Sequence, residues 1–206
     1  MARGRKLIQV ALRGPLLEQG WTPRAAGCFT RLVAPGALGV LAVGVASEHS
    51  APGSARATLH VHLRDEQLEA DVAHLTGGRD QGYRTPTATT SIGYLMPAAR
   101  WHEWNVGPDS ADAVASEMAE AADAYSEPHL RALVADPLAL LAARASSASF
   151  ASPIGRARAV LLLRRTGQGL EAAEFLERRV SELAARSGAA AEMERRVIAA
   201  LESGAP

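Results

Sequence analysis

The stretch Thr58-Leu59-His60-Val61-His62-Leu63-Arg64 decides the fold class, because it alternates strictly between apolar and polar side chains. Successive side chains of a β-strand point to opposite faces, so this pattern predicts a half-exposed strand with the two leucines and Val61 on the core side. His60, His62 and Arg64 are expected on the opposite, solvent-side face.

The residues before this strand predict a hairpin and an N-terminal helix. Cys28 to Val33 and Leu38 to Ala46 flank the turn sequence Ala34-Pro35-Gly36. The second of these runs is apolar or small on both faces, which is typical of a strand inside a sheet. Helical spacing of apolar residues predicts an amphipathic helix over about residues 4–18, divided or kinked by Pro15.

The residues after the strand predict a short helix, a long loop and two more short strands. The helix is expected over Asp65 to Leu75, ending before Gly77-Gly78. The polar stretch from Thr76 to Ser91 is expected to be a loop, and whether its part from Gly77 to Thr90 orders on binding stays open. Ile92 to Met96 and Trp104 to Val106 are candidate strands.

From Asp109 onward the pattern becomes helical. Apolar residues recur at helical spacing, and the pairs Asp136-Pro137 and Ser152-Pro153 are good helix starts, with a capping side chain before a proline at the first helical position. The sequence therefore predicts an α+β fold with an N-terminal helix, an antiparallel sheet of about four or five strands and a helical C-terminal half. Residues 1–108 and 109–206 are expected to pack as one cooperative unit.

Composition excludes several classes of protein. The chain has 22 basic and 22 acidic side chains, and this neutrality argues against a strongly nucleic-acid-binding surface. No apolar run approaches the roughly 20 residues that span a bilayer. The single Cys28 excludes an internal disulfide framework and fits a reducing compartment. Together with the lack of a long apolar run, this leads us to expect a cytoplasmic protein that does not act on membranes.

The pair His60-x-His62 is the strongest candidate for chemistry. Both imidazoles lie on one face of the predicted strand, a spacing that can chelate zinc or iron if a third ligand is available. A metal-dependent hydrolase that uses these two histidines is therefore the enzymatic alternative, although the polar half of an amphipathic strand is the favoured explanation of the pair. Possible further ligands nearby in the sequence are Glu48, His49, Asp65, Glu66 and His74.

Two other groups of residues allow binding functions. Trp101-His102-Glu103-Trp104 places two of the three tryptophans within four residues, which suits either core packing between helices and sheet or the centre of a protein interface. Four arginines form a basic cluster that suits a solvated face or, as a third reading, nucleic-acid binding. They are Arg156, Arg158, Arg164 and Arg165. The glycines of the 76–82 loop lack the ending of a phosphate-binding motif.

Part of the sequence resembles a bacterial family of unknown function. The resemblance rests on the amphipathic start that ends in Gly20-Trp21, on the strand Cys28-Phe29-Thr30-Arg31-Leu32, and on Trp104 followed by Asp112 and Pro128-His129-Leu130. It covers residues 7–165, and Trp21 stands where phenylalanine is usual. Small α+β proteins of this kind are often immunity or antitoxin proteins, so the resemblance implies a binding role and supplies no catalytic residue.

We therefore expect a non-enzymatic protein-binding protein, of the immunity or antitoxin kind or a subunit of a larger assembly. Its partner is expected to be another protein, and neither a cofactor nor a metal is expected. The residues predicted to contact the partner are Trp101, Trp104, His60, His62 and Arg64.

Overall fold

The computed structural model describes residues 2–46, 54–137, 139–140 and 152–203, and it confirms the α+β fold. Contacts within the chain separate two compact units. Unit 1 comprises Met1–Arg64 and Thr89–Val134, and unit 2 comprises Asp65–Ala88 and Ala135–Pro206. The division therefore does not fall near residue 108, because the sheet keeps two of the later helices and a segment from the first half belongs with the C-terminal helices.

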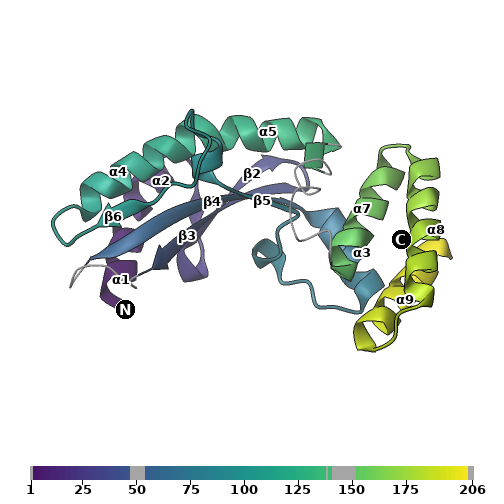
Figure 1. The fold of residues 1–206 in the computed structure, drawn as a ribbon. Helices are drawn as coiled ribbons and strands as arrows, with labels where there is room; N and C mark the ends of the chain where they lie inside the picture. The colour runs from purple at the N-terminus through teal and green to yellow at the C-terminus, as the bar shows by residue number, and fades with distance from the viewer. Residues whose placement is uncertain (1, 47–53, 138, 141–151, 204–206) are drawn as a thin grey trace. The chain divides into compact units, whose positions relative to one another are not determined.

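Unit 1 contains a six-stranded sheet in the order β1-β2-β3-β4-β5, with β6 also paired to β4 (Figure 1). β3 lies in the middle of this order, which confirms its prediction as a central strand. The strands are β1 (Thr22–Pro23), β2 (Cys28–Ala34), β3 (Ala37–Ala46), β4 (Ala55–Asp65), β5 (Ala88–Ser91) and β6 (Trp104–Val106).

The β2–β3 hairpin fixes which side chains share a face. Antiparallel register places Thr30 opposite Val40, and a bulge between Leu32 and Ala34 precedes the turn, where Gly36 has a φ of 75°. Positive φ is open to glycine without steric cost, so Gly36 suits this turn. On β4 the buried residues Leu59, Val61 and Leu63 alternate with half-buried His60 and His62, which confirms the predicted alternation.

Helices cover one face of this sheet. In Figure 1, α4 and α5 run along that face, joined without a break by the π-helical turn η4. A Cβ atom on Gly39 of β3 would come within 2.8 Å of the Leu130 side chain, so α5 packs closely against the strand. The helices of unit 1 are α1 (Ala2–Ala11), α2 (Arg13–Glu18), α4 (Ala111–Ala121), η4 (Ala122–Ser126) and α5 (Glu127–Ala135).

Arg31 joins the first helices, the sheet and α5. Its guanidinium lies 4.4 Å from the centre of the Trp21 ring, donates a hydrogen bond of 3.0 Å to the carbonyl of Gln19, and forms an ion pair with Glu127. Cation–aromatic stacking and a hydrogen-bonded ion pair together hold the chain after α2 against β2. Trp21 and Arg31, two residues of the family resemblance, therefore have a structural role here.

Unit 2 is a group of helices with one loop segment. Helix α3 packs against α7 and α9, and α7 also packs against α8. The side chain of Asp65 caps α3 by accepting a hydrogen bond of 2.8 Å from the amide of Leu68, and Gly77 ends the helix in a left-handed conformation. The elements are α3 (Glu66–Thr76), η2 (Gly82–Arg84), α7 (Pro153–Arg165), α8 (Gly169–Ala184) and α9 (Ala189–Glu202).

The predicted local structure is corrected at three places. The N-terminal helix is divided at Leu12 and not at Pro15, which lies inside α2. Ile92 to Met96 is not a strand, because Ile92–Tyr94 forms the 3-10 turn η3. The end of the predicted loop instead forms β5. The helix start at Ser152-Pro153 is confirmed by a hydrogen bond of 3.0 Å from the Gly155 amide to the Ser152 hydroxyl. Most of the segment that follows Asp136-Pro137 lies outside the described residues.

Candidate functional site

The two histidines of β4 lie on the sheet face opposite to α5. Gly44 of β3 points to the same side as His60, because a Cβ atom there would come within 2.4 Å of the Thr58 hydroxyl and 3.6 Å of the His60 ring. The missing side chain at position 44 therefore leaves room for Thr58 and His60, whose Oγ1 and Nε2 atoms are 3.2 Å apart. His62 Nδ1 lies 2.8 Å from the hydroxyl oxygen of Thr89 on β5.

Three aromatic rings meet on this face. The rings of His60 and His62 are stacked at 6.3 Å between centroids, with an angle of 18° between their planes. The Trp101 ring lies 5.8 Å from that of His60, tilted by 55°, and 49% of Trp101 is exposed. We call the surface formed by Thr58, His60, His62, Thr89 and Trp101 the histidine face. These five side chains offer hydrogen-bonding groups and one exposed indole, and the ion pair of Arg56 with Glu103 lies next to them.

Burial keeps both imidazoles of the histidine face uncharged at neutral pH. Loss of hydration lowers the pKa of His60, and loss of hydration together with the nearby charge of His60 lowers the pKa of His62 to about 4. Neutral imidazoles can ligate a metal. However, no group of three or more histidine, cysteine, aspartate or glutamate side chains suited to a metal ion occurs in the described part of the chain.

Trp104 does not belong to the histidine face, although it was predicted to contact a partner. Trp104 is paired with Ala57 in the β4–β6 ladder, and directly opposed residues of an antiparallel pair point to the same side. Because Ala57 lies on the core side with Leu59 and Val61, Trp104 is directed into the core and only 6% of it is exposed. The pairing register, which sequence reasoning did not supply, separates the two tryptophans.

The expectation that Arg64 is exposed is also wrong. Strand alternation places Arg64 on the side of His60 and His62, yet only 2% of the residue is exposed. Alternation determines to which side of the sheet a side chain points, but it does not determine how deeply a side chain at the end of the strand is buried. Reversing the charge of Arg64 is therefore expected to destabilise the fold, since it would bury a carboxylate in place of a guanidinium.

The segment that carries Trp101 is held on both sides. Arg56 of β4 forms an ion pair of 2.9 Å with Glu103, and the Arg100 amide donates a hydrogen bond of 3.1 Å to the Gly93 carbonyl of η3. The His102 ring packs edge-on against Trp104 at 4.4 Å between centroids. Buried Trp104 and the Arg56–Glu103 pair thus fix the backbone from which Trp101 projects.

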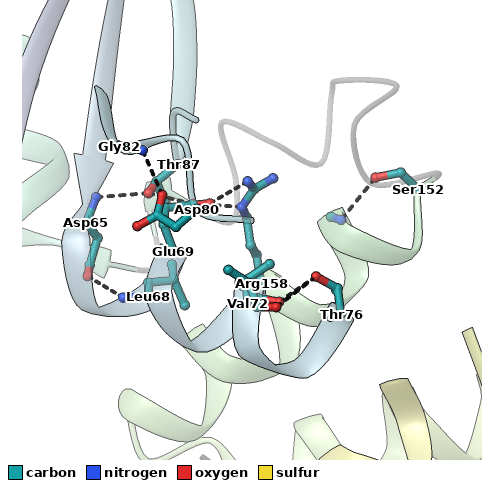
Figure 2. A network of polar contacts seen from close by, with 12 residues as sticks. Asp65, Leu68, Glu69, Val72, Thr76, Asp80, Gly82, Thr87, Ser152 and Arg158 are labelled. Atoms are coloured by element: carbon teal, nitrogen blue, oxygen red, sulfur yellow. Dashed lines mark hydrogen bonds and ion pairs between the residues drawn. The ribbon is translucent and has the colours of Figure 1, made fainter. Parts of the chain in front are cut away.

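In unit 2, the four arginines of the predicted basic cluster all have acidic or carbonyl partners. Arg158 donates to both carboxylate oxygens of Glu69, and the Thr87 hydroxyl donates to the same carboxylate at 2.8 Å (Figure 2). Arg165 pairs with Asp65 and Asp71, Arg156 pairs with Glu194, and Arg164 donates to the Leu201 carbonyl. These contacts join helices within unit 2, so ion pairing inside the fold explains the cluster without a nucleic acid.

These pairings were missed in the sequence, although a signal was present. Asp65, the cap of α3, precedes Glu69 by four residues, and Arg158 and Arg165 are seven residues apart on α7. Both spacings keep side chains on one face of a helix. Opposite charges, each set confined to one helix face, could therefore have suggested that α3 and α7 pair. In the glycine-containing loop, the Asp80 carboxylate accepts a hydrogen bond of 2.9 Å from the Gly82 amide, which leaves that amide unavailable to an anion.

Comparisons with protein-family models, with curated proteins and with solved structures found no match to this chain. No helix among the described residues is both long and apolar enough to cross a membrane. The function has to be argued from the histidine face and its surroundings alone.

Proposed function

We propose that this chain is a non-enzymatic, cytoplasmic protein-binding protein that engages its partner through the histidine face of unit 1. Its partner is another protein, as expected for a protein of the immunity or antitoxin kind or for a subunit of a larger assembly. Binding requires neither a cofactor nor a metal. The residues that contact the partner are Trp101, His60 and His62, whereas Trp104 and Arg64 support them from inside the fold.

The observation that carries the proposal is the exposure of Trp101. A tryptophan that keeps 49% of its surface exposed while its backbone is fixed presents a large apolar area with little side-chain freedom to lose on binding. Tryptophan is among the residues that contribute most to binding energy at protein interfaces. The neutral imidazoles next to it can accept or donate hydrogen bonds without the desolvation cost of a charged group.

A second exposed aromatic residue lies on a segment that adjoins the one carrying Trp101. Tyr94 of η3 is 53% exposed, and the backbone of η3 is hydrogen-bonded to the segment that carries Trp101. Aromatic residues are enriched at the centres of interfaces, where their polar atoms can still find partners. Two exposed aromatic side chains on adjoining segments favour recognition of a protein surface over binding of a small polar molecule.

The test is an affinity purification of the tagged chain at native expression, with the captured proteins identified by mass spectrometry and the purified protein analysed for metals. We expect a stoichiometric protein partner. Trp101→Ala is expected to weaken the purified complex by 10-fold or more, on the order of 1.4 kcal/mol or above, because truncated interface tryptophans commonly cost this much. The matched control is Leu170→Ala, which removes a side chain that is 80% exposed in unit 2.

Two outcomes would contradict the proposal. One is a partner whose affinity is unchanged by Trp101→Ala. The other is a stoichiometric metal that is lost when His60 and His62 are both changed to alanine, which would support a metal-dependent hydrolase instead. Circular dichroism of each variant separates a loss of contact from a loss of folding.

A further inference from the structure

A pocket in unit 2 lies beside the turn between α8 and α9. Its volume is about 340 Å³, and it is bordered by α7, by the end of α8 and by the first turns of α9. This volume is within the range of small-ligand sites, which is about 300–1,000 Å³. The side chains that give the pocket its chemistry are Arg156, Arg179, Arg186, Ser187 and Glu194.

Two of the arginines are fixed in place by one carboxylate. Arg156 Nη2 lies 2.6 Å from Glu194 Oε2, and Arg179 binds the same carboxylate through Nε at 2.6 Å and Nη2 at 3.0 Å. The side chains of Arg156 and Arg179 are only 14% and 12% exposed. Both guanidinium groups are therefore oriented before any ligand arrives, which reduces the entropy that a ligand must overcome.

The pocket carries an excess of positive charge. Burial alone would raise the pKa of Glu194, but hydrogen bonds from Arg179 and Arg156 outweigh burial and lower it, so Glu194 remains ionised at neutral pH. One carboxylate then faces three guanidinium groups in the lining. Glu182 also pairs with Arg179 but is 49% exposed, and water screens an exposed pair strongly.

We propose that this pocket binds a small oxyanion, namely the phosphate or carboxylate group of a low-molecular-weight ligand. The guanidinium group of Arg186 can match either anion with paired hydrogen bonds, and the hydroxyl of Ser187 adds a neutral donor. The paired edges of Arg156 and Arg179 already hold Glu194, so these two residues contribute positive charge. An anion here would balance the cationic lining, which Glu194 offsets only in part. The site is independent of the histidine face, because every residue that lines it belongs to unit 2.

The test is titration of the full-length protein with inorganic phosphate and, separately, with citrate at constant ionic strength, followed by calorimetry and by backbone NMR. Saturable binding of phosphate alone identifies a phosphate site, and saturable binding of citrate alone identifies a carboxylate site. Either result supports the proposal if the NMR shifts centre on the turn between α8 and α9. No saturable binding of either anion at millimolar concentrations overturns it.

Two single substitutions distinguish the pocket from general charge attraction. Arg186→Gln removes an exposed cation of the lining, so it is expected to leave the fold intact and weaken anion binding about tenfold. Arg178→Gln removes another exposed cation, on α8, that does not line the pocket and is expected to leave binding unchanged. Equal weakening by both substitutions would mean non-specific attraction and would refute the site.

Discussion

At the scale of single residues, Glu69 is the position in unit 2 where we expect a substitution to cost the most stability. Its side chain is fully buried, and its carboxylate accepts hydrogen bonds from Arg158 and from the Thr87 hydroxyl. A buried ion pair gains little over well-packed apolar side chains, since both ions lose their hydration. Removing one member is far more damaging, because it leaves the other charge buried without compensation. Glu69 and Arg158 therefore depend on each other.

Glu69→Gln is expected to lower the free energy of unfolding by about 3–5 kcal/mol, because it keeps the shape of the side chain and leaves the Arg158 charge uncompensated. Urea denaturation measures the change. Replacing both residues with leucine should recover most of the loss. The matched control is Glu192→Gln, which breaks an exposed pair with Arg195 and should cost less than about 1 kcal/mol. Similar losses for both single variants would contradict the mutual dependence.

His62 should make stability depend on pH. Its pKa is lowered to about 4 in the folded protein, whereas an unfolded chain titrates near the ordinary value of 6.5. Between pH 4 and 6.5 only the unfolded chain binds a proton at this position. The contribution of His62 to the free energy of unfolding is therefore fully present above pH 6.5 and is lost as the pH falls toward about 4. We expect a loss of about 1–3 kcal/mol from this group. Denaturation across this pH range should show a shallower slope for His62→Gln, and an unchanged slope would contradict the assignment.

At the scale of elements, η3 shows why local sequence was insufficient. The apolar run from Ile92 to Met96 suits a strand, but Gly93 is in close contact with the segment before β6. A Cβ atom at position 93 would come within 2.4 Å of the Arg100 carbonyl oxygen and 2.8 Å of the His102 amide nitrogen. This backbone contact, between residues distant from the local pattern, selects the 3-10 turn. The same contact positions the residues on either side of Trp101.

Gly93→Ala is therefore expected to destabilise unit 1 by about 1–3 kcal/mol, because backbone atoms have to move to admit a methyl group. It should also weaken partner binding by displacing Trp101, whose fluorescence spectrum should change. Gly14→Ala in α2 is the control, since nothing lies within 4 Å of a Cβ atom there. That change should be neutral or stabilise by less than about 1 kcal/mol. Equal effects of the two substitutions would contradict the contact.

The sequence predicts single elements well, but it does not predict how separate elements pack against each other. The hairpin, the alternating strand β4, the end of α3 at Gly77, the cap of α7 and the helical C-terminal half all follow from local patterns, and the structure confirms them. The burial of Trp104 and the ion pair between Glu69 and Arg158 depend on strand register and helix packing, which single-sequence periodicity does not contain. For the histidine face, the sequence predicted His60, His62 and Trp101, but it did not supply Thr58, Thr89 or the role of Gly44.

At the scale of the whole molecule, neither unit is a continuous segment of the chain. The polypeptide passes from unit 1 to unit 2 after Arg64, returns at Thr89 and leaves again after Val134. A cut near residue 108, where strands give way to helices in the sequence, would remove α4 and α5 from the sheet. It would also separate α3 from α7. Each half would then expose apolar surface that the intact chain buries.

Fragments 1–108 and 109–206 are accordingly expected to be unfolded or aggregated when each is produced alone. Circular dichroism and NMR dispersion measure this directly. Mixing the two fragments, which together contain every element, should restore part of the native spectrum. If fragment 1–108 gave a cooperative unfolding transition by itself, the division into two discontinuous units would be wrong.

The discontinuity of unit 2 also matters for synthesis on the ribosome. Translation makes Glu69 first, and Arg158 follows 89 residues later. By the time residue 134 has been made, every segment of unit 1 is present, whereas α3 still lacks α7 and α9. The Glu69 carboxylate, which is buried in the folded protein, must remain hydrated until Arg158 has been made. Unit 1 can therefore fold during translation, and unit 2 has to wait until the C-terminal helices have left the exit tunnel.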